Sequence, residues 1–255
     1  MARTPLSFVV RRTERLSDHL IRVHLGGPGF SAFTPNGFTD AYVKLQIPGP
    51  DGPTTRTYTV RSIDPELEQI AIDFVYHGAE GVAGPWAAAA QPGDELTLSG
   101  PGGAYAPKLD ADWHLLAGDE SALPAISVAC AALPESAVGR VFVEISGPAD
   151  ELDFPRPAGV NLDWVHRGDR EPGAALAEAV LAEPWRAGRV HVFIHGEAQV
   201  VMHELRPYIR KERGVPADHA SISGYWRRGR TEETFRQWKR ELAEREGAQP
   251  TGAPR

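Results

Sequence analysis

The sequence predicts a two-domain β and α/β protein: a six-stranded antiparallel β-barrel over residues 5–107, followed by a parallel α/β domain over residues 108–246. Before Pro107, short runs of β-branched and aromatic residues are separated by turn-forming clusters, which is typical of an antiparallel sandwich or barrel. After Pro107, strand-like and helix-like stretches alternate, which predicts a parallel sheet with helices on both faces. A length of 255 residues fits one or two domains.

The strands of the barrel are expected between turn-forming segments such as Gly26–Gly29 and Pro48–Pro53. One helix, over residues 84–90, interrupts them, because Pro85 suits the first helical position and the alanine run that follows favours a helix interior. The expected strands are Leu6–Arg11, Leu20–Leu25, Tyr42–Ile47, Thr55–Arg61, Gln69–His77 and Glu95–Ser99.

The α/β domain is expected to contain five strands and four helices. The strands are Trp113–Ala117, Arg140–Ile145, Val160–His166, Arg189–His195 and Ala220–Gly224. The helices are Ser121–Leu133, Gly173–Ala182, the amphipathic Gln199–Arg213 and the charged Thr231–Arg245. From Gly247 the residues are Gly, Pro and polar types, so we expect residues 247–255 to be a disordered tail.

Composition excludes several classes of function. A formal net charge of -7 argues against indiscriminate nucleic-acid binding. A single cysteine, Cys130, excludes an intramolecular disulfide and any cysteine cage for zinc or iron–sulfur, and we expect no metal site. The N-terminus lacks an apolar stretch of signal-peptide length, and no run approaches ~18 apolar residues. We therefore expect a cytoplasmic protein without an integral membrane segment.

The first candidate ligand-binding segment is Arg56-Thr57-Tyr58-Thr59, which lies inside an expected strand. Because side chains alternate along a strand, Arg56 and Tyr58 share one face. Arginine can bind phosphate through two hydrogen bonds, and tyrosine can stack on a flat conjugated ring. The pair therefore suits a ligand that has both groups, although a surface arginine beside a packed tyrosine is the alternative.

A second candidate segment runs from His77-Gly78 into Ala83-Gly84-Pro85-Trp86, where a glycine-containing loop enters the expected helix. Unsatisfied backbone N–H groups and the helix dipole favour a pyrophosphate at such a position. Ala83 and Gly84 are small enough for close approach of a ligand to the backbone. An ordinary loop-to-helix turn is the alternative, and a structural role for His77 is favoured over a proton relay.

A third segment, Gly118-Asp119-Glu120-Ser121, lies at a strand-to-helix turn where a nucleotide-binding loop belongs in an α/β fold. It is not G-x-G-x-x-G, and its carboxylates would repel phosphate but could cap the helix or bind a ribose hydroxyl. After the next strand, Ser146–Glu151 offers carboxylates and no nearby arginine. This composition favours NADH slightly over NADPH.

Two further segments follow the last two expected strands of the α/β domain. His195-Gly196-Glu197-Ala198 could line the same cleft or could simply form a turn. Gly224–Arg230 combines Tyr225 and Trp226 with three arginines. A ring there could cover a flavin, and the arginines could attract an anionic substrate, although such charge runs are usually solvated. No catalytic triad or P-loop motif is present, so no side chain is expected to act as a nucleophile.

Together, these segments in this order resemble the siderophore-interacting protein family of FAD-dependent ferric-siderophore reductases, within the ferredoxin reductase-like superfamily. The resemblance covers the chain from about Phe8 to Trp238. Arg56-Thr57-Tyr58-Thr59 is similar to the superfamily's R-x-Y-[ST] flavin motif. The other segments that carry the resemblance are Asp73–Val75 with His77-Gly78, Gly84–Trp86, Gly100–Gly103, Gly118–Ala125 and Gly224–Gly229.

The resemblance implies that FAD lies against the barrel and that the flavin carries the chemistry. It implies a donor that is either NAD(P)H or a ferredoxin, because Gly118–Ala125 departs from the glycine-rich loop of general ferredoxin reductases. The substrate is expected to be a ferric siderophore, attracted by Lys44, Arg227 and Arg228. The expected cofactor-binding residues are Arg56, Tyr58, Thr59, Asp73, Val75, His77, Ala83, Gly84, Trp86, Asp119, Ser121, Ala122 and Trp226.

Three other functions remain compatible with the residues alone. One is a general flavin electron-transfer reductase that has a protein partner such as a ferredoxin. Another is a carrier that binds flavin or siderophore without turnover. The third is an NAD(P)H:flavin reductase that releases free reduced flavin.

Overall fold

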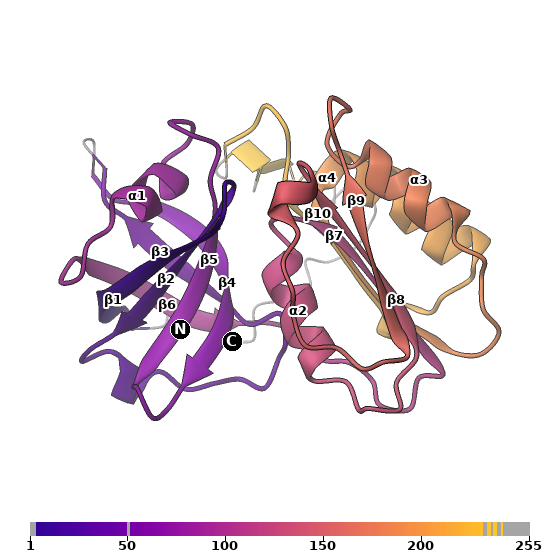
Figure 1. Ribbon diagram of the computed structural model, residues 1–255, viewed down its shortest axis with the longest axis horizontal. Coiled ribbons are helices and arrows are strands. Elements are labelled where there is room, and N and C mark those ends of the chain that lie inside the picture. The colour runs from indigo at the N-terminus through magenta and orange to yellow at the C-terminus, as the bar shows by residue number, and fades with distance from the viewer. Residues whose placement is uncertain (1–3, 50–51, 232–233, 236, 239–240, 242–255) are drawn as a thin grey trace.

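The computed structural model describes residues 4–49, 52–231, 234–235, 237–238 and 241. The N-terminal half is a closed antiparallel barrel with the strand order β1-β2-β5-β4-β3-β6, as the sequence predicted (Figure 1). Its strands are β1 (Leu6–Ser17), β2 (Leu20–Gly26), β3 (Tyr42–Ile47), β4 (Thr54–Asp64), β5 (Gln69–Val75) and β6 (Glu95–Gly102).

A short helix, α1 (Ala83–Ala89), packs on the core of the barrel. Ala83 and Ala87 are buried there beside Phe74 of β5. The inward-facing residues are aliphatic and phenylalanine side chains that alternate along the strands, which is the pattern that made the strands recognisable. A 3-10 turn, Phe30–Ala32, lies between β2 and β3.

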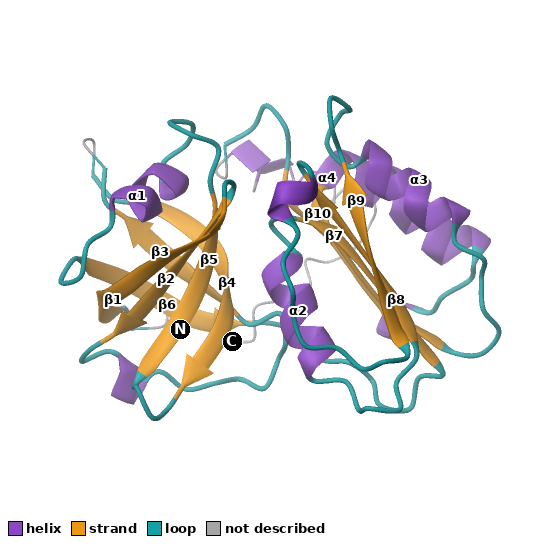
Figure 2. Ribbon diagram, in the orientation of Figure 1, coloured by secondary structure: helices purple, strands orange, loops and turns teal. Residues whose placement is uncertain are grey.

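The second half contains a parallel sheet with the order β11-β10-β7-β8-β9. Figure 2 shows α2 (Leu123–Ala131) on the side of this sheet that faces the barrel and α3 (Ala174–Ala182) on the opposite side. Helices therefore cover both faces, as expected. The strands are β7 (Trp113–Asp119), β8 (Gly139–Ile145), β9 (Val160–His166), β10 (Val190–Glu197) and β11 (Ala220–Trp226). Two 3-10 turns are Pro148–Asp150 and Ala217–His219.

The helix expected over 199–213 has a different geometry. It begins as α4 (Ala198–Val200) and continues through π-helical turns at Val201–Leu205 and Tyr208–Glu212. Pro207 has no N–H to donate to the preceding turn, and around it the ladder widens, so that the Arg206 N–H bonds to the Val201 carbonyl. Of the expected helix 231–245, the described residues 234–235, 237–238 and 241 are helical; the tail 247–255 lies outside the described residues.

The barrel and the α/β half share a hydrophobic core. Leu20 from β2 and Val75 from β5 pack into the cluster that α2 forms with the sheet. Asp40 accepts hydrogen bonds from the backbone N–H groups of Ala104 and Tyr105, each at 2.9 Å, and so fixes the segment that connects the two halves. Among the described residues, no helix is long and apolar enough to cross a membrane.

Candidate functional site

Strand β4 holds Arg56 and Tyr58 on one face, as the alternation predicted. In the register with β3, Arg56 lies opposite Leu45 and Tyr58 lies opposite Val43. Both side chains are half-buried, and the Tyr58 ring packs on Phe74 with 4.4 Å between ring centroids. Arg56 Nη1 donates to the Thr55 carbonyl at 2.9 Å. A cation and an aromatic ring therefore stand side by side on the barrel.

Thr59 is buried and lies opposite Tyr42, the first residue of β3. The sequence analysis did not single out Tyr42. Its side chain is 37% exposed, and its ring lies against Gly102, where an added Cβ would meet the ring. Tyr42 therefore presents an open aromatic surface beside the β4 segment. The available signal was weak: an aromatic residue at an outward position of a predicted strand, two residues before Lys44.

Helix α1 and the loop before it form the second part of the site. Trp86 also packs on Phe74, with 5.5 Å between centroids, so that Phe74 and Trp86 form an apolar base next to Tyr58. Gly84 is explained by packing, because a Cβ there would lie 2.9 Å from the Val75 carbonyl oxygen. In contrast, Gly78 and Gly81 have φ angles of 66° and 73° and face open space.

Three further predicted residues lie on or just after β5. Asp73 is buried, and its carboxylate accepts hydrogen bonds from Arg22 Nε and Nη2 at 2.6 and 2.8 Å, so its charge is already paired within the barrel wall. Val75 packs into the core shared with α2. His77 is exposed, with 6.3 Å between its ring centroid and that of His19.

At the carboxyl end of the parallel sheet, the fold brings together predicted residues that are far apart in sequence. Trp226 Nε1 donates to Asp119 Oδ2 at 2.7 Å. Ser121 donates to Asp119 Oδ1 from both its backbone N–H, at 3.0 Å, and its hydroxyl, at 2.5 Å. Ala122 is fully buried beneath this turn, against Gly118. Asp119, Ser121 and Trp226 therefore form one connected group.

The Asp119 carboxyl has an unusual electrostatic environment. Burial raises its pKa to about 6, and the neighbouring charge of Glu120 adds to this rise, while the hydrogen bonds from Ser121 and Trp226 oppose it. The side chain is 2% exposed. Tyr225, which precedes Trp226 on β11, also has a raised pKa, chiefly because burial disfavours its charged form.

The premise that no arginine lies near Ser146 was wrong. Arg167, just after β9, places Nη2 at 2.8 Å from both Ser146 Oγ and Glu120 Oε1. Its Nη1 donates to Glu120 Oε2 and Glu144 Oε1 at 3.3 and 3.4 Å. The contact escaped the sequence analysis because 47 residues separate Arg167 from Glu120. All four terminal N–H groups of Arg167 are therefore engaged.

The three residues predicted to attract the substrate lie in different settings. Lys44 is exposed on the barrel strand β3. The Arg227 guanidinium lies 4.8 Å from the centroid of the Trp238 ring, and Arg228 forms an ion pair with Glu171. The two arginines therefore have partners within the α/β half, whereas Lys44 lies on the barrel wall.

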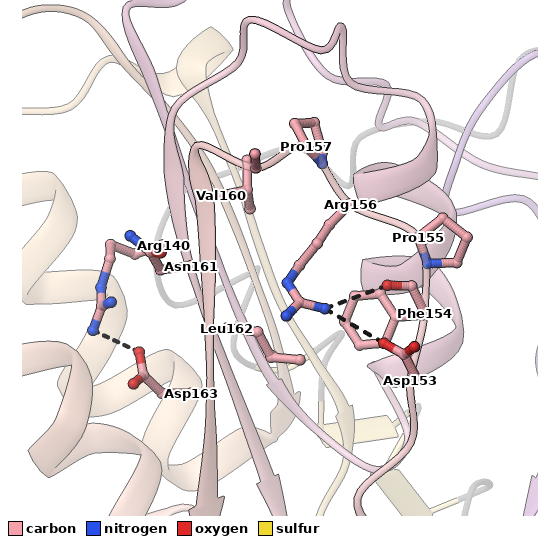
Figure 3. Close-up of a pocket in the computed structure, with 11 residues that line it drawn as sticks. Arg140, Asp153, Phe154, Pro155, Arg156, Pro157, Val160, Asn161, Leu162 and Asp163 are labelled. Carbon is pink, nitrogen blue, oxygen red and sulfur yellow. Dashed lines mark hydrogen bonds and ion pairs between the residues drawn. The ribbon is translucent and has the colours of Figure 1, made fainter.

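A hollow of about 750 Å³ lies at the outer edge of the sheet, beside β9 (Figure 3). Figure 3 shows Arg156 extending over Leu162 on one side of the strand, while Arg140 pairs with Asp163 on the other. None of the predicted site residues lines this hollow. Within the described ranges, no three His, Cys, Asp or Glu side chains are grouped so that they could hold a metal ion.

Comparison with known families assigns both halves of the chain. Residues 46–105 match the model of the siderophore-interacting FAD-binding domain, and residues 111–229 match that of the siderophore-interacting protein. The chain belongs to the siderophore-interacting protein family. The first match contains the β4 and α1 segments, and the second contains Asp119 and Trp226.

Three relatives of this family member span most of both chains. An uncharacterised protein of Mycobacterium tuberculosis is 52% identical over 96% of this chain and 99% of its own. The ferric vibriobactin reductase ViuB of Vibrio cholerae is 34% identical over 90% of this chain and 91% of its own. The NADPH-dependent ferric-chelate reductase of Escherichia coli is 31% identical over 85% of this chain and 91% of its own.

Solved structures agree with the fold. A siderophore utilization protein from T. fusca is 33% identical, with a TM-score of 0.82, over 91% of this chain and 95% of its own. The ferredoxin reductase in carbazole 1,9a-dioxygenase is 15% identical, with a TM-score of 0.71, over 88% of this chain and 70% of its own. The fold is therefore ferredoxin reductase-like.

The residues present fit a flavin dinucleotide. Arg56 supplies a cation for phosphate, and Tyr58 supplies an aromatic face supported by Phe74. The loop with Gly78 and Gly81 presents its backbone to open space directly before α1. These donors lie within residues matched by the FAD-binding domain.

Proposed function

We propose that this chain is an FAD-dependent reductase of ferric siderophores. The observation that carries the proposal is the match of residues 46–105 to the siderophore-interacting FAD-binding domain, in which Arg56, Tyr58 and Thr59 stand together on β4. The relatives named as ferric reductases support the choice of substrate. The domain boundaries 5–107 and 108–246 belong to the same proposal.

In this proposal, the barrel residues hold FAD. Arg56 binds phosphate or ribityl oxygens, and Tyr58 and Thr59 contact the isoalloxazine. Backbone groups from Ala83 to Trp86 hold the pyrophosphate. Val75 and His77 contribute from the end of β5, while Asp73 acts indirectly, because its carboxylate is already paired with Arg22.

Bound FAD would supply the exchange between a hydride donor, which gives two electrons, and ferric iron, which accepts one. The chain's own part is to bind and orient the reactants and to exclude water. Hard oxygen ligands hold Fe³⁺ more tightly than Fe²⁺, so reduction weakens the complex and releases iron. No side chain needs to act as a nucleophile.

The proposed donor is a nicotinamide nucleotide that approaches the carboxyl end of the parallel sheet, where ligands of such folds bind. The name of the Escherichia coli relative supports a nucleotide donor. Ser121 would lie beside the nucleotide, and Trp226 beside the flavin ring, whereas the fully buried Ala122 would support the turn from beneath and not contact the nucleotide. A ferredoxin is the second candidate, favoured by the absence of a glycine-rich loop at Gly118–Ala125.

The ferric siderophore needs a local positive surface, because the chain as a whole carries a net charge of -7. Lys44, Arg227 and Arg228 are proposed to attract it. Lys44 is the strongest of the three, since it lies exposed near Tyr42, whereas the arginines already contact Trp238 and Glu171.

Anaerobic half-reactions test this proposal. The FAD-loaded protein is photoreduced and mixed with a ferric hydroxamate or catecholate chelate, and flavin absorbance and ferrous iron are followed together. The proposal expects reoxidation of the flavin with release of Fe²⁺ that a ferrous chelator traps. Persistent reduced flavin would indicate a carrier. In a separate test of the donor, reduction by reduced ferredoxin but not by NADH or NADPH would indicate a protein donor.

A further inference from the structure

The hydrogen bond between Trp226 and Asp119 depends on an irregularity at the end of β11. Along β10 and β11 the register pairs Gly196 with Gly224 and then Glu197 with Trp226, so that Tyr225 has no direct partner in the pairing. At this bulge Trp226 reaches Asp119, the last residue of β7, which lies on the far side of β10 from β11.

A glycine at position 196 leaves room for the hydrogen bond between Trp226 and Asp119. Gly196 has a φ of 149°, and a Cβ there would lie 2.7 Å from Asp119 Oδ2. A side chain at position 196 would therefore displace the carboxylate oxygen that Trp226 binds. The other oxygen, Oδ1, is held by the backbone N–H and hydroxyl of Ser121. Asp119 is thus fixed at both oxygens.

Holding Asp119 in this way has an energetic cost. The carboxylate is 2% exposed, its hydrogen-bond donors among the described residues are the neutral groups of Ser121 and Trp226, and Glu120 lies beside it in the chain. A buried carboxylate without a paired cation disfavours folding in its charged form. The turn before α2 accounts for Oδ1, which accepts the backbone N–H and hydroxyl of Ser121, whereas the use of Oδ2 is control of the Trp226 indole.

Trp226 differs from its aromatic neighbour in how it is packed. Tyr225 packs on His195 with 4.6 Å between centroids and belongs to the core shared with the barrel. Trp226 is half-buried, as Tyr225 is, but its indole nitrogen is bonded to Asp119. One edge of the indole is therefore fixed while part of the ring surface stays accessible.

We propose that Asp119 is a positioning residue, which orients the Trp226 indole against the isoalloxazine of bound FAD and does not itself contact the cofactor. This inference rests on the proposed function, in which Trp226 lies beside the flavin ring. In this inference, Asp119 orients an aromatic side chain through a hydrogen bond and does not bind a ribose hydroxyl.

The test compares Asp119→Ala, Asp119→Asn, Trp226→Phe and the double variant Asp119→Ala/Trp226→Phe with the wild-type holoprotein. Matched controls are Asp153→Asn and Trp164→Phe, which change the same residue types at the far edge of the sheet. Near-UV circular dichroism confirms that each variant is folded. Asp119→Asn keeps the side-chain shape and one oxygen acceptor, so it keeps the test valid if Asp119→Ala does not fold.

Two measurements distinguish the loss of the Asp119–Trp226 hydrogen bond from its effect on the bound flavin. In the apoprotein, the indole N–H resonance that disappears in Trp226→Phe should shift in Asp119→Ala. In the holoprotein, an indole in contact with the isoalloxazine quenches flavin emission. Trp226→Phe should therefore raise the fluorescence of bound flavin several-fold and weaken FAD binding about fivefold, as expected for one lost aromatic contact. Asp119→Ala should reproduce both effects, Asp119→Asn should reproduce them in part, and the double variant should add nothing further.

The inference is overturned if the indole resonance shifts in Asp119→Ala but flavin fluorescence and FAD affinity stay at wild-type values. It is also overturned if the effects of the two single variants add in full. Failure of the wild-type protein to bind FAD would instead refute the proposed function, so the two failures are distinguishable.

Discussion

Tyr105 stacks on His191 with 4.8 Å between ring centroids and 21° between ring planes. This contact joins the segment that leaves the barrel to the central part of the parallel sheet. The Lys108 backbone N–H also donates to His191 Nδ1 at 3.0 Å. His191 is therefore held in its neutral form, and burial together with nearby His114 and Lys108 lowers its pKa to about 4.

The first prediction concerns stability as pH falls. The ordinary pKa of histidine is 6.5, so between pH 6.5 and about 4 the unfolded chain binds a proton at His191 that the folded protein does not. The stability that neutral His191 contributes to the folded protein is complete above pH 6.5 and is lost as pH falls towards 4. Between pH 7.0 and about 4.5, we expect the free energy of unfolding of His191→Gln to fall by roughly 2 kcal/mol less than that of the wild type, as measured by urea unfolding. His203→Gln, at an exposed site, is the control; an unchanged pH dependence in His191→Gln would refute the assignment.

The second prediction concerns Gly84 in α1. Alanine normally stabilises a helix interior relative to glycine by up to ~1 kcal/mol. Here the sign reverses, because the new Cβ would lie 2.9 Å from the Val75 carbonyl oxygen and would push α1 away from β5. We expect Gly84→Ala to lower the free energy of unfolding by about 1–3 kcal/mol and to weaken FAD binding. Gly147→Ala, which faces open space, should change stability by less than about 0.5 kcal/mol. A stabilised Gly84→Ala would contradict the packing argument.

The third prediction concerns Arg167. Replacement by glutamine leaves the carboxylates of Glu120 and Glu144 without their cation, and both side chains are buried. We expect a loss of about 3–5 kcal/mol in the free energy of unfolding. Because the four terminal N–H groups of Arg167 are engaged with protein acceptors, the ratio of kcat/KM for NADPH to that for NADH should not change. The exposed Arg170→Gln is the control for stability. A selective loss of NADPH use would show that Arg167 binds the 2′-phosphate.

The sequence predicted more of the fold than of the contacts at the site. The barrel strands and Arg56-Thr57-Tyr58-Thr59 were recognisable because side-chain alternation and turn residues are local signals. Trp226 and Asp119 were both predicted as site residues, but their bond joins positions 107 apart and depends on a strand bulge. The Arg167 contacts likewise arise from the order of strands in the sheet. Local patterns carry no information about such pairings.

The fourth prediction concerns Lys44. In Lys44→Glu, we expect the rate of reduction of an anionic ferric siderophore to fall several-fold at low ionic strength, with FAD content unchanged. The difference should shrink as salt is added, because the charge is exposed. Arg12→Glu, on β1, makes the same change in net charge and should have little effect. Equal rates in Lys44→Glu and wild type would exclude Lys44 from the docking surface.

The most direct measurement is the visible absorption spectrum of the purified protein after incubation with FAD and gel filtration. If Arg56, Tyr58 and the α1 segment hold a flavin dinucleotide, the protein will emerge yellow, with flavin bands near one equivalent per chain, and Arg56→Ala will lose most of them. A colourless protein that takes up no added FAD would contradict the account.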